Sequence, residues 1–263
     1  MSRTLGFALR AFDCNIRVET ACHEAHDILQ RYLFPSIART DNTIATPDIL
    51  FCVERRDDKF QLSVNGAPVA IADSAVNLAV AAIKALDDHV VQRLTTLRAV
   101  HAGAILFSNR AMLIPGSTHA GKSSLVAELL RRGASYLSDE YALIDEEGHV
   151  HPYPRPLLLR NGRPRQVPVL PGELNASFAR ERAAVGWVLS LEYEAANTWS
   201  IQSVSQGEAL MILLRNTPHP LQESPSMKDA FLRAVARASC YSGQRGDAVQ
   251  AADAILKLVG GVA

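Results

Sequence analysis

The feature that most constrains the fold is a loop bracketed by two glycines, set between an apolar run and a helical pattern. The apolar run covers residues 111–114 and ends at Pro115, and Gly116 and Gly121 enclose the loop. The chain continues as KSSLVAELLRRG, which has leucines at helical spacing and Gly133 where a helix would end. A strand, a tight loop and a helix in this order predict an α/β core, because a strand and the helix after it bury their apolar sides together.

The letters of the loop, G-x-x-x-x-G-K-S, also predict its ligand. Glycines let the backbone curl so that successive N–H groups and the first turn of the helix face a phosphate group. Lys122 would neutralise the β- and γ-phosphate oxygens, and the Ser123 hydroxyl would bind the Mg²⁺ that bridges them. We therefore expect a nucleoside triphosphate, taken as ATP, with Mg²⁺. The alternative is a glycine-rich turn before an ordinary helix. His119 would either bind a phosphate through its ring or contribute only its backbone. The residues expected to contact the nucleotide are Gly116, Ser117, Thr118, His119, Ala120, Gly121, Lys122, Ser123 and Ser124.

An acidic pair follows the loop after about one helix. Asp139 and Glu140 end the short apolar run in ASYLSDE. In proteins with this kind of loop, a carboxylate at a strand end lies near the Mg²⁺ or the attacking group. One carboxylate would hold the metal through water while the other accepts a proton from a hydroxyl nucleophile. The alternative is a solvated turn before a hairpin. The predicted metal ligands are Ser123, Asp139 and Glu140.

The order of these motifs resembles that of a known family. Val100-His101-Ala102, the loop and the acidic pair lie within residues 99–160, a block similar to the HPr serine kinase/phosphorylase superfamily. It is more closely similar to the smaller HPr-kinase-like proteins, including the peptide kinases associated with lasso-peptide biosynthesis. The resemblance implies that Asp139 is the general base and that Lys122 and Ser123 keep their nucleotide and metal roles. It also implies that His101 is a hydrogen-bonding or proton-handling partner of the acidic pair; the alternative is a buried strand histidine.

Two departures limit what this resemblance implies. The bifunctional members have two aspartates in the acidic pair, whereas this chain has Asp-Glu, and their EIRGLG signature is absent. RPLLLRNG at residues 155–162 takes a comparable place without the glutamate. Phosphorolysis and binding of HPr are therefore not expected, while the kinase chemistry is. Arg155 or Arg160 would clamp a phosphoryl group or a substrate carboxylate through paired N–H donors, or else lie on the surface of a proline-stiffened strand.

Charge and composition narrow the partners. The 263 residues include 27 basic and 27 acidic side chains, so no net field attracts nucleic acid or an anionic membrane. The most apolar later segment, AVNLAVAAIKAL, is interrupted by Asn77 and Lys84, and the first residues lack an apolar signal region. Four cysteines without paired spacing indicate free thiols in a reducing compartment. We expect a cytoplasmic protein, with room for a homo-oligomer.

Two parts of the chain differ in pattern. Residues 1–96 read as an N-terminal α+β region: one bent strand or two short ones, a helix near 21–34, strands joined by turns at 56–58 and 65–66, and a helix from 75 to about 96. Residues 97–263 read as the P-loop domain of HPr-kinase type, with the N-terminal region packed against it as a substrate or accessory domain. Ser108-Asn109-Arg110 and residues 145–148 read as hairpin turns.

The function expected from these observations is an ATP- and Mg²⁺-dependent kinase. Its acceptor would be a serine or threonine hydroxyl on a peptide or small protein, such as a ribosomally made precursor peptide. The alternatives are a P-loop ATPase or regulatory nucleotide-binding module without phosphoryl transfer, and a small-molecule kinase. The loop does not distinguish these, because the acceptor would be selected outside it.

Overall fold

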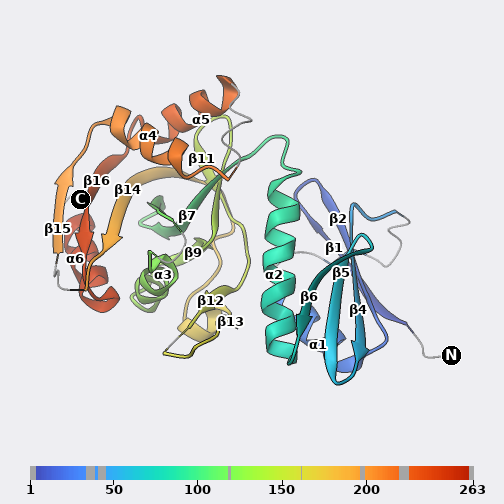
Figure 1. Ribbon diagram of the computed structural model, residues 1–263. Helices are drawn as coiled ribbons and strands as arrows, with labels where there is room; N and C mark the ends of the chain where they lie inside the picture. The colour runs from blue at the N-terminus through green and yellow to red at the C-terminus, as the bar shows by residue number, and fades with distance from the viewer. Residues whose placement is uncertain are drawn as a thin grey trace. The chain divides into compact units, whose positions relative to one another are not determined.

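The structure of the chain is a computed structural model that describes residues 4–33, 39–40, 46–117, 120–160, 162–195, 199–218 and 225–260. It is a mixed α/β protein that divides into two compact units (Figure 1). Unit 1 comprises residues 1–95 and 154–170, and unit 2 comprises residues 96–153 and 171–263. The sequence pattern predicted a single boundary, at 96/97. Residues 154–170, which lie in the predicted second domain, instead group with the first unit.

Unit 1 contains a six-stranded sheet with helices on one face. Alternate strand residues are buried, as in Cys14–Thr20, because one face packs against the helices and the other does not. Helix α2 lies beside the edge strand β6 in Figure 1. The sheet order is β3-β1-β2-β4-β5-β6. The elements are β1 Leu5–Ala11, β2 Cys14–Thr20, α1 His23–Tyr32, β3 Arg39–Thr40, β4 Ile49–Arg56, β5 Lys59–Val64, β6 Ala67–Ala72 and α2 Ala75–Val91, with β12 Leu157–Leu159 and β13 Val167–Val169 pairing separately.

Most local predictions for this region are confirmed. Residues 5–20 form two strands rather than one bent strand, and the turns at 57–58 and 65–66 lie where turn residues indicated them. The second helix was predicted to about Thr96 but ends at Val91. There the Arg93 N–H bonds to the carbonyl of Val90 at 3.0 Å, a tightened i to i−3 turn that stops the helix.

Unit 2 contains the sheet β11-β10-β7-β8-β14-β16-β15, with β9 also on β7. Strand β11 pairs again with the start of β14, so the sheet curls back on itself (Figure 1). The elements are β7 Arg98–Phe107, β8 Arg110–Pro115, α3 Lys122–Arg131, β9 Ser135–Ser138, β10 Tyr141–Ile144, β11 His149–His151, the 3₁₀ turn Pro171–Leu174, β14 Ala183–Tyr193, β15 Trp199–Ser203, α4 Gln206–Arg215, α5 Pro225–Val235, β16 Ser239–Arg245 and α6 Ala248–Gly260.

Helices cover both faces of this sheet. Val100, Ala102 and Ala104 of β7 belong to a core that includes residues of α4 and α5. Gly103 points to the opposite face, because neighbouring strand residues alternate, and it lies against Val126 of α3. Helix α3 therefore packs on the face away from α4 and α5, where it also contacts α6.

The hairpin at 108–109, the strand–loop–helix order and the turn at 145–148 agree with the sequence predictions. Helix α4 and strand β16 were not predicted. Within the described ranges, no helix is long and apolar enough to cross a membrane.

Candidate phosphate-binding site

Gly121, the second glycine of the loop between β8 and α3, has a backbone conformation that favours glycine. Gly121 caps α3 in the left-handed region, with φ 70° and ψ 20°. The positive φ favours glycine, and a Cβ there would lie 2.5 Å from Nη2 at the end of the Arg245 side chain, which would have to move. Thr118 and His119 fall outside the described residues, and their predicted contacts stay predictions.

Lys122 lies over the start of this loop. Its ammonium donates to the carbonyl oxygens of Gly116 at 2.8 Å and Ser117 at 2.9 Å, and the residue is 8% exposed. Burial lowers the pKa of Lys122 below its ordinary value of 10.5, and the negative charges of Glu140 and Asp139 act in the opposite sense. The lysine and the acidic pair are therefore close enough to interact electrostatically, and the ammonium is held where the loop begins.

The acidic pair lies at the same edge of the sheet as the loop. Strands β8 and β9 both run antiparallel to β7, so they point the same way and their carboxyl ends share one edge. Ser138 pairs with Ala104, and Tyr141, the first residue of β10, pairs with His101. Residues 139–140 thus directly follow the end of β9, as predicted, and connect it to β10, which also pairs with β7. The Asp139 side chain is buried and that of Glu140 is half-buried.

His101 connects the acidic pair to the loop. Its Nε2 lies 2.7 Å from Glu140 Oε1, so a ring carrying its proton on Nε2 donates to that carboxylate. Its carbonyl oxygen accepts a hydrogen bond at 3.3 Å from the N–H of Gly116, which is the first residue of the loop. His101 is thus both a partly buried strand histidine and a partner of Glu140, the two alternatives that the sequence left open.

The side chains predicted to bind a metal ion offer the ligand atoms that Mg²⁺ prefers. Ser123 and Ser124 stand in the first turn of α3, half-buried and exposed respectively. Ser123 with Asp139 and Glu140 makes a donor set of oxygen atoms only, the set that Mg²⁺ prefers. The residues present therefore fit this ion.

The two predicted clamp arginines belong to unit 1, whereas the loop and the acidic pair belong to unit 2. Arg155 is neither a surface residue nor open to a ligand: it is 2% exposed, its nitrogen atoms are buried, and Nη2 forms an ion pair with Asp87 at 2.9 Å. The clamp interpretation of Arg155 is thus replaced by a tie between α2 and the segment before β12. Arg160 is exposed after β12, and its role stays a prediction.

Arg245, the last residue of β16, was not predicted as a site residue. This strand is rich in Ser, Gly and Gln, so it lacks the β-branched pattern that indicates a strand. The Arg245 guanidinium is 2% exposed and donates to the carbonyl oxygens of Ala120 and Gly121, both at 2.9 Å. No sequence signal near the loop indicates this residue, because it lies more than a hundred positions away from the loop.

A second polar cluster in unit 2 surrounds Asp145, at the start of the β10–β11 turn. Asp145 accepts from His151 Nε2 at 2.8 Å and from Arg182 Nη1 at 2.6 Å, and the same Arg182 nitrogen lies 3.1 Å from Glu147. Asp145, Glu147 and His149 could approach a metal ion by distance alone. Because Arg182 contacts both carboxylates and His151 also bonds to Asp145, we interpret the cluster as structural.

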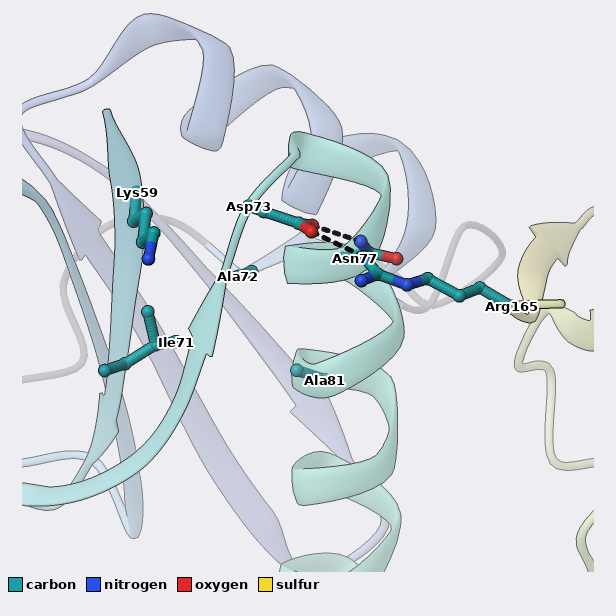
Figure 2. Close-up of a pocket in the computed structure, with 7 residues that line it drawn as sticks. All are labelled: Lys59, Ile71, Ala72, Asp73, Asn77, Ala81 and Arg165. Carbon is teal, nitrogen blue, oxygen red and sulfur yellow. Dashed lines mark hydrogen bonds and ion pairs between the residues drawn. The ribbon is translucent and has the colours of Figure 1, made fainter. Parts of the chain in front are cut away.

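Unit 1 has a surface hollow of about 370 Å³ (Figure 2). Asp73 lies between Arg165, at 2.6 Å, and the amide of Asn77, and both ion-pair partners are more than half exposed. No predicted site residue lines it. The lining residues are Lys59, Ile71, Ala72, Asp73, Asn77, Ala81 and Arg165.

No family model matches this chain, and no curated protein matches it. Among solved structures, the Hpr(Ser) kinase/phosphatase from Coxiella burnetii is similar over 62% of this chain and 99% of that chain, with 14% sequence identity and a TM-score of 0.31. A likeness at this level assigns neither family nor activity.

Proposed function

We propose that this chain is an ATP- and Mg²⁺-dependent kinase that phosphorylates a serine or threonine hydroxyl of a peptide or small protein. One observation carries the proposal. The glycine loop, the buried Lys122, the acidic pair and His101 gather at one edge of one sheet, and the hydrogen bonds of His101 join the loop to Glu140. A structural turn before a helix would not need a buried ammonium and two carboxylates beside it.

The phosphates would bind at the N-terminus of α3. The N–H groups of the first helical turn have no partner within the helix, and the helix dipole favours negative charge there. Lys122 would exchange its bonds to the Gly116 and Ser117 carbonyls for bonds to phosphate oxygens. This exchange is favourable because an ammonium gains more from an anion than from neutral carbonyls.

Mg²⁺, when bound, would neutralise charge on the β- and γ-phosphate oxygens during transfer. Ser123 would hold it directly, and Glu140 would hold it directly or through water. The bond from His101 fixes the orientation of the Glu140 carboxylate, which a metal ligand requires.

Asp139 would accept the proton of the acceptor hydroxyl. The hydroxyl oxygen then attacks the γ-phosphorus in line, the bond from that phosphorus to the β-phosphate oxygen breaks, and ADP leaves. The Asp139 side chain is 1% exposed, so this role requires the residues that cover it to move when the acceptor binds. The acceptor's identity would be determined by residues outside the loop.

The test incubates the protein with labelled ATP, Mg²⁺ and peptides encoded by neighbouring genes, and detects transfer of the label by mass spectrometry of the peptides. We expect a phosphorylated hydroxyl with the full-length chain and a loss of about 100-fold or more with Asp139→Asn. The matched control is Asp229→Asn, an exposed aspartate of α5, which should transfer as the unchanged chain does. Transfer that persists in Asp139→Asn would contradict the base assignment. Release of phosphate without any acceptor would favour the ATPase alternative.

A further inference from the structure

Arg245 reaches the phosphate-binding loop from a distant part of the chain. Strand β16 runs parallel to β14, which runs parallel to β8, so the carboxyl ends of all three strands lie at one edge. Arg245 Nη2 donates to the carbonyl oxygens of Ala120 and Gly121, and Nη1 donates to the carbonyl of Gly246, each at 2.9 Å. One guanidinium thus ties the end of the loop to the end of β16.

These bonds help to determine where the N–H groups of Gly121 and Lys122 point, together with the Leu125 N–H, which donates to the Gly121 carbonyl at 3.2 Å. In a planar trans peptide, the C=O of one residue and the N–H of the next point in opposite directions. Since the Ala120 and Gly121 carbonyls face Arg245, the N–H groups of Gly121 and Lys122 face away from it. Those N–H groups belong to the end of the loop and the start of α3, where a bound phosphate would accept hydrogen bonds from them.

The charge of Arg245 is also unusual for its position. The Arg245 guanidinium lies over the aromatic ring of Tyr193, with its carbon Cζ 5.4 Å from the ring centroid. Within the ranges that the structure describes, its hydrogen-bond acceptors are backbone carbonyls and no carboxylate forms an ion pair with it. Burial lowers the pKa of Arg245, while Tyr193 and Asp247 act in the opposite sense. An arginine keeps its proton in such a setting, so a buried positive charge remains beside the loop.

We infer that Arg245 is a positioning residue of the phosphate-binding loop: it orients the N–H groups of Gly121 and Lys122 toward a bound triphosphate, and its charge adds to the attraction for that anion. This inference rests on the proposed nucleotide binding. A side chain at position 121 would displace the guanidinium from these carbonyls.

A purely structural arginine would behave differently. If Arg245 only joined strand ends, replacing it would lower the melting temperature and leave the affinity of the folded protein for triphosphate unchanged. A positioning role predicts weaker binding of any ligand that presents a triphosphate, with or without a nucleoside, because the defect lies in the loop.

The experiment compares the full chain with Arg245→Met and Arg245→Lys. Calorimetry measures the dissociation constants of Mg²⁺–ATP and of inorganic tripolyphosphate, and the melting temperature is recorded without ligand. Arg245→Met should weaken both ligands by about 10- to 100-fold, and Arg245→Lys, which keeps the charge but loses the fork, by about 10-fold. Arg215→Met, an exposed arginine of α4, is the matched control and should bind as the unchanged chain does.

The outcomes distinguish a failure of the proposed function from a failure of the role inferred for Arg245. If the unchanged chain binds neither ligand, the proposed function fails. If the unchanged chain binds both but Arg245→Lys and every folded Arg245→Met sample bind equally well, this inference alone is overturned. If Arg245→Met does not fold, Arg245→Lys decides: weaker binding of both ligands at an unchanged melting temperature supports the inference, and unchanged binding overturns it.

Discussion

Replacing Gly103 with alanine should disturb the packing that places the loop. Gly103 lies in β7, the strand between β8 and the acidic pair, and faces α3. A Cβ at this position would lie 2.6 Å from Val126 Cγ2 and 3.9 Å from Ile114 Cβ. An ordinary contact begins at 3.4 Å, so Val126 and its helix must move by about 0.8 Å.

The magnitude follows from two opposing terms. Adding a methyl group to a packed interior destabilises by about 1–3 kcal/mol. Alanine in a strand interior recovers about 0.5–1 kcal/mol relative to glycine, because it has less backbone entropy to lose. The middle of each range gives a net loss of about 1.3 kcal/mol in the free energy of unfolding, within limits of about 0 and 2.5 kcal/mol, which corresponds to a fall of about 3–5 °C in melting temperature for a unit of this size.

Urea and thermal unfolding of the full chain measure this loss. Gly207→Ala in α4 is the matched control, because the nearest atom to its Cβ would be Ser205 Oγ at 3.9 Å, and alanine there should be neutral or stabilise by up to about 1 kcal/mol. In a double-mutant cycle with Val126→Ala, the two changes should be less than additive, since a smaller side chain at 126 makes room for the new methyl group. A Gly103→Ala protein as stable as the unchanged chain would refute the packing argument.

Two further predictions concern charged groups away from the loop. Burial alone would raise the pKa of Asp145, but hydrogen bonds from the His149 backbone N–H, His151 and Arg182 outweigh it and lower that pKa below 3.8. The stabilisation is therefore present above about pH 4 and lost as the pH falls through the folded-state pKa, so Asp145→Asn should destabilise by about 1–3 kcal/mol at pH 7 and show a smaller difference at pH 3, by urea midpoints. A difference that does not shrink in acid would contradict this. Asp87→Ala should destabilise by about 3–5 kcal/mol, because it leaves the Arg155 charge buried, and Arg155→Met in the same chain should restore much of the loss; a loss within about 0.5 kcal/mol would show that the pair is not desolvated in solution.

The parts of the fold that local chemistry determines could be predicted from the sequence. Ser108 and Asn109 both adopt positive φ, 46° and 60°, at the hairpin turn, and Asn65-Gly66 does the same at another. The order of strand, loop and helix around Gly121 followed from the glycines and the helical spacing of the leucines. In each case neighbouring residues hold the information.

The parts that were missed depend on residues far apart in the chain. Arg155 was expected at a ligand or on a surface, but its partner Asp87 lies on a helix of the N-terminal region, which no local pattern shows. Arg245 was missed because β16 forms through pairing with β14 rather than through strand propensity. The acidic pair follows the end of β9 as predicted, but the hydrogen bond between Glu140 and His101 depends on the pairing of β10 with β7, which joins residues far apart in the chain.

The most direct test of the account measures triphosphate binding at the loop. The melting temperature of the full chain is recorded with and without Mg²⁺–ATP, alongside Lys122→Ala and the control Lys257→Ala, an exposed lysine of α6. Ligand at about 100 times its dissociation constant stabilises by about 2.7 kcal/mol, so the unchanged chain and Lys257→Ala should melt several degrees higher with ligand. Lys122→Ala should show no ligand-dependent shift. A shift in Lys122→Ala equal to that of the unchanged chain, or no shift in any of the three, would contradict the assignment of residues 116–124 as a phosphate-binding loop.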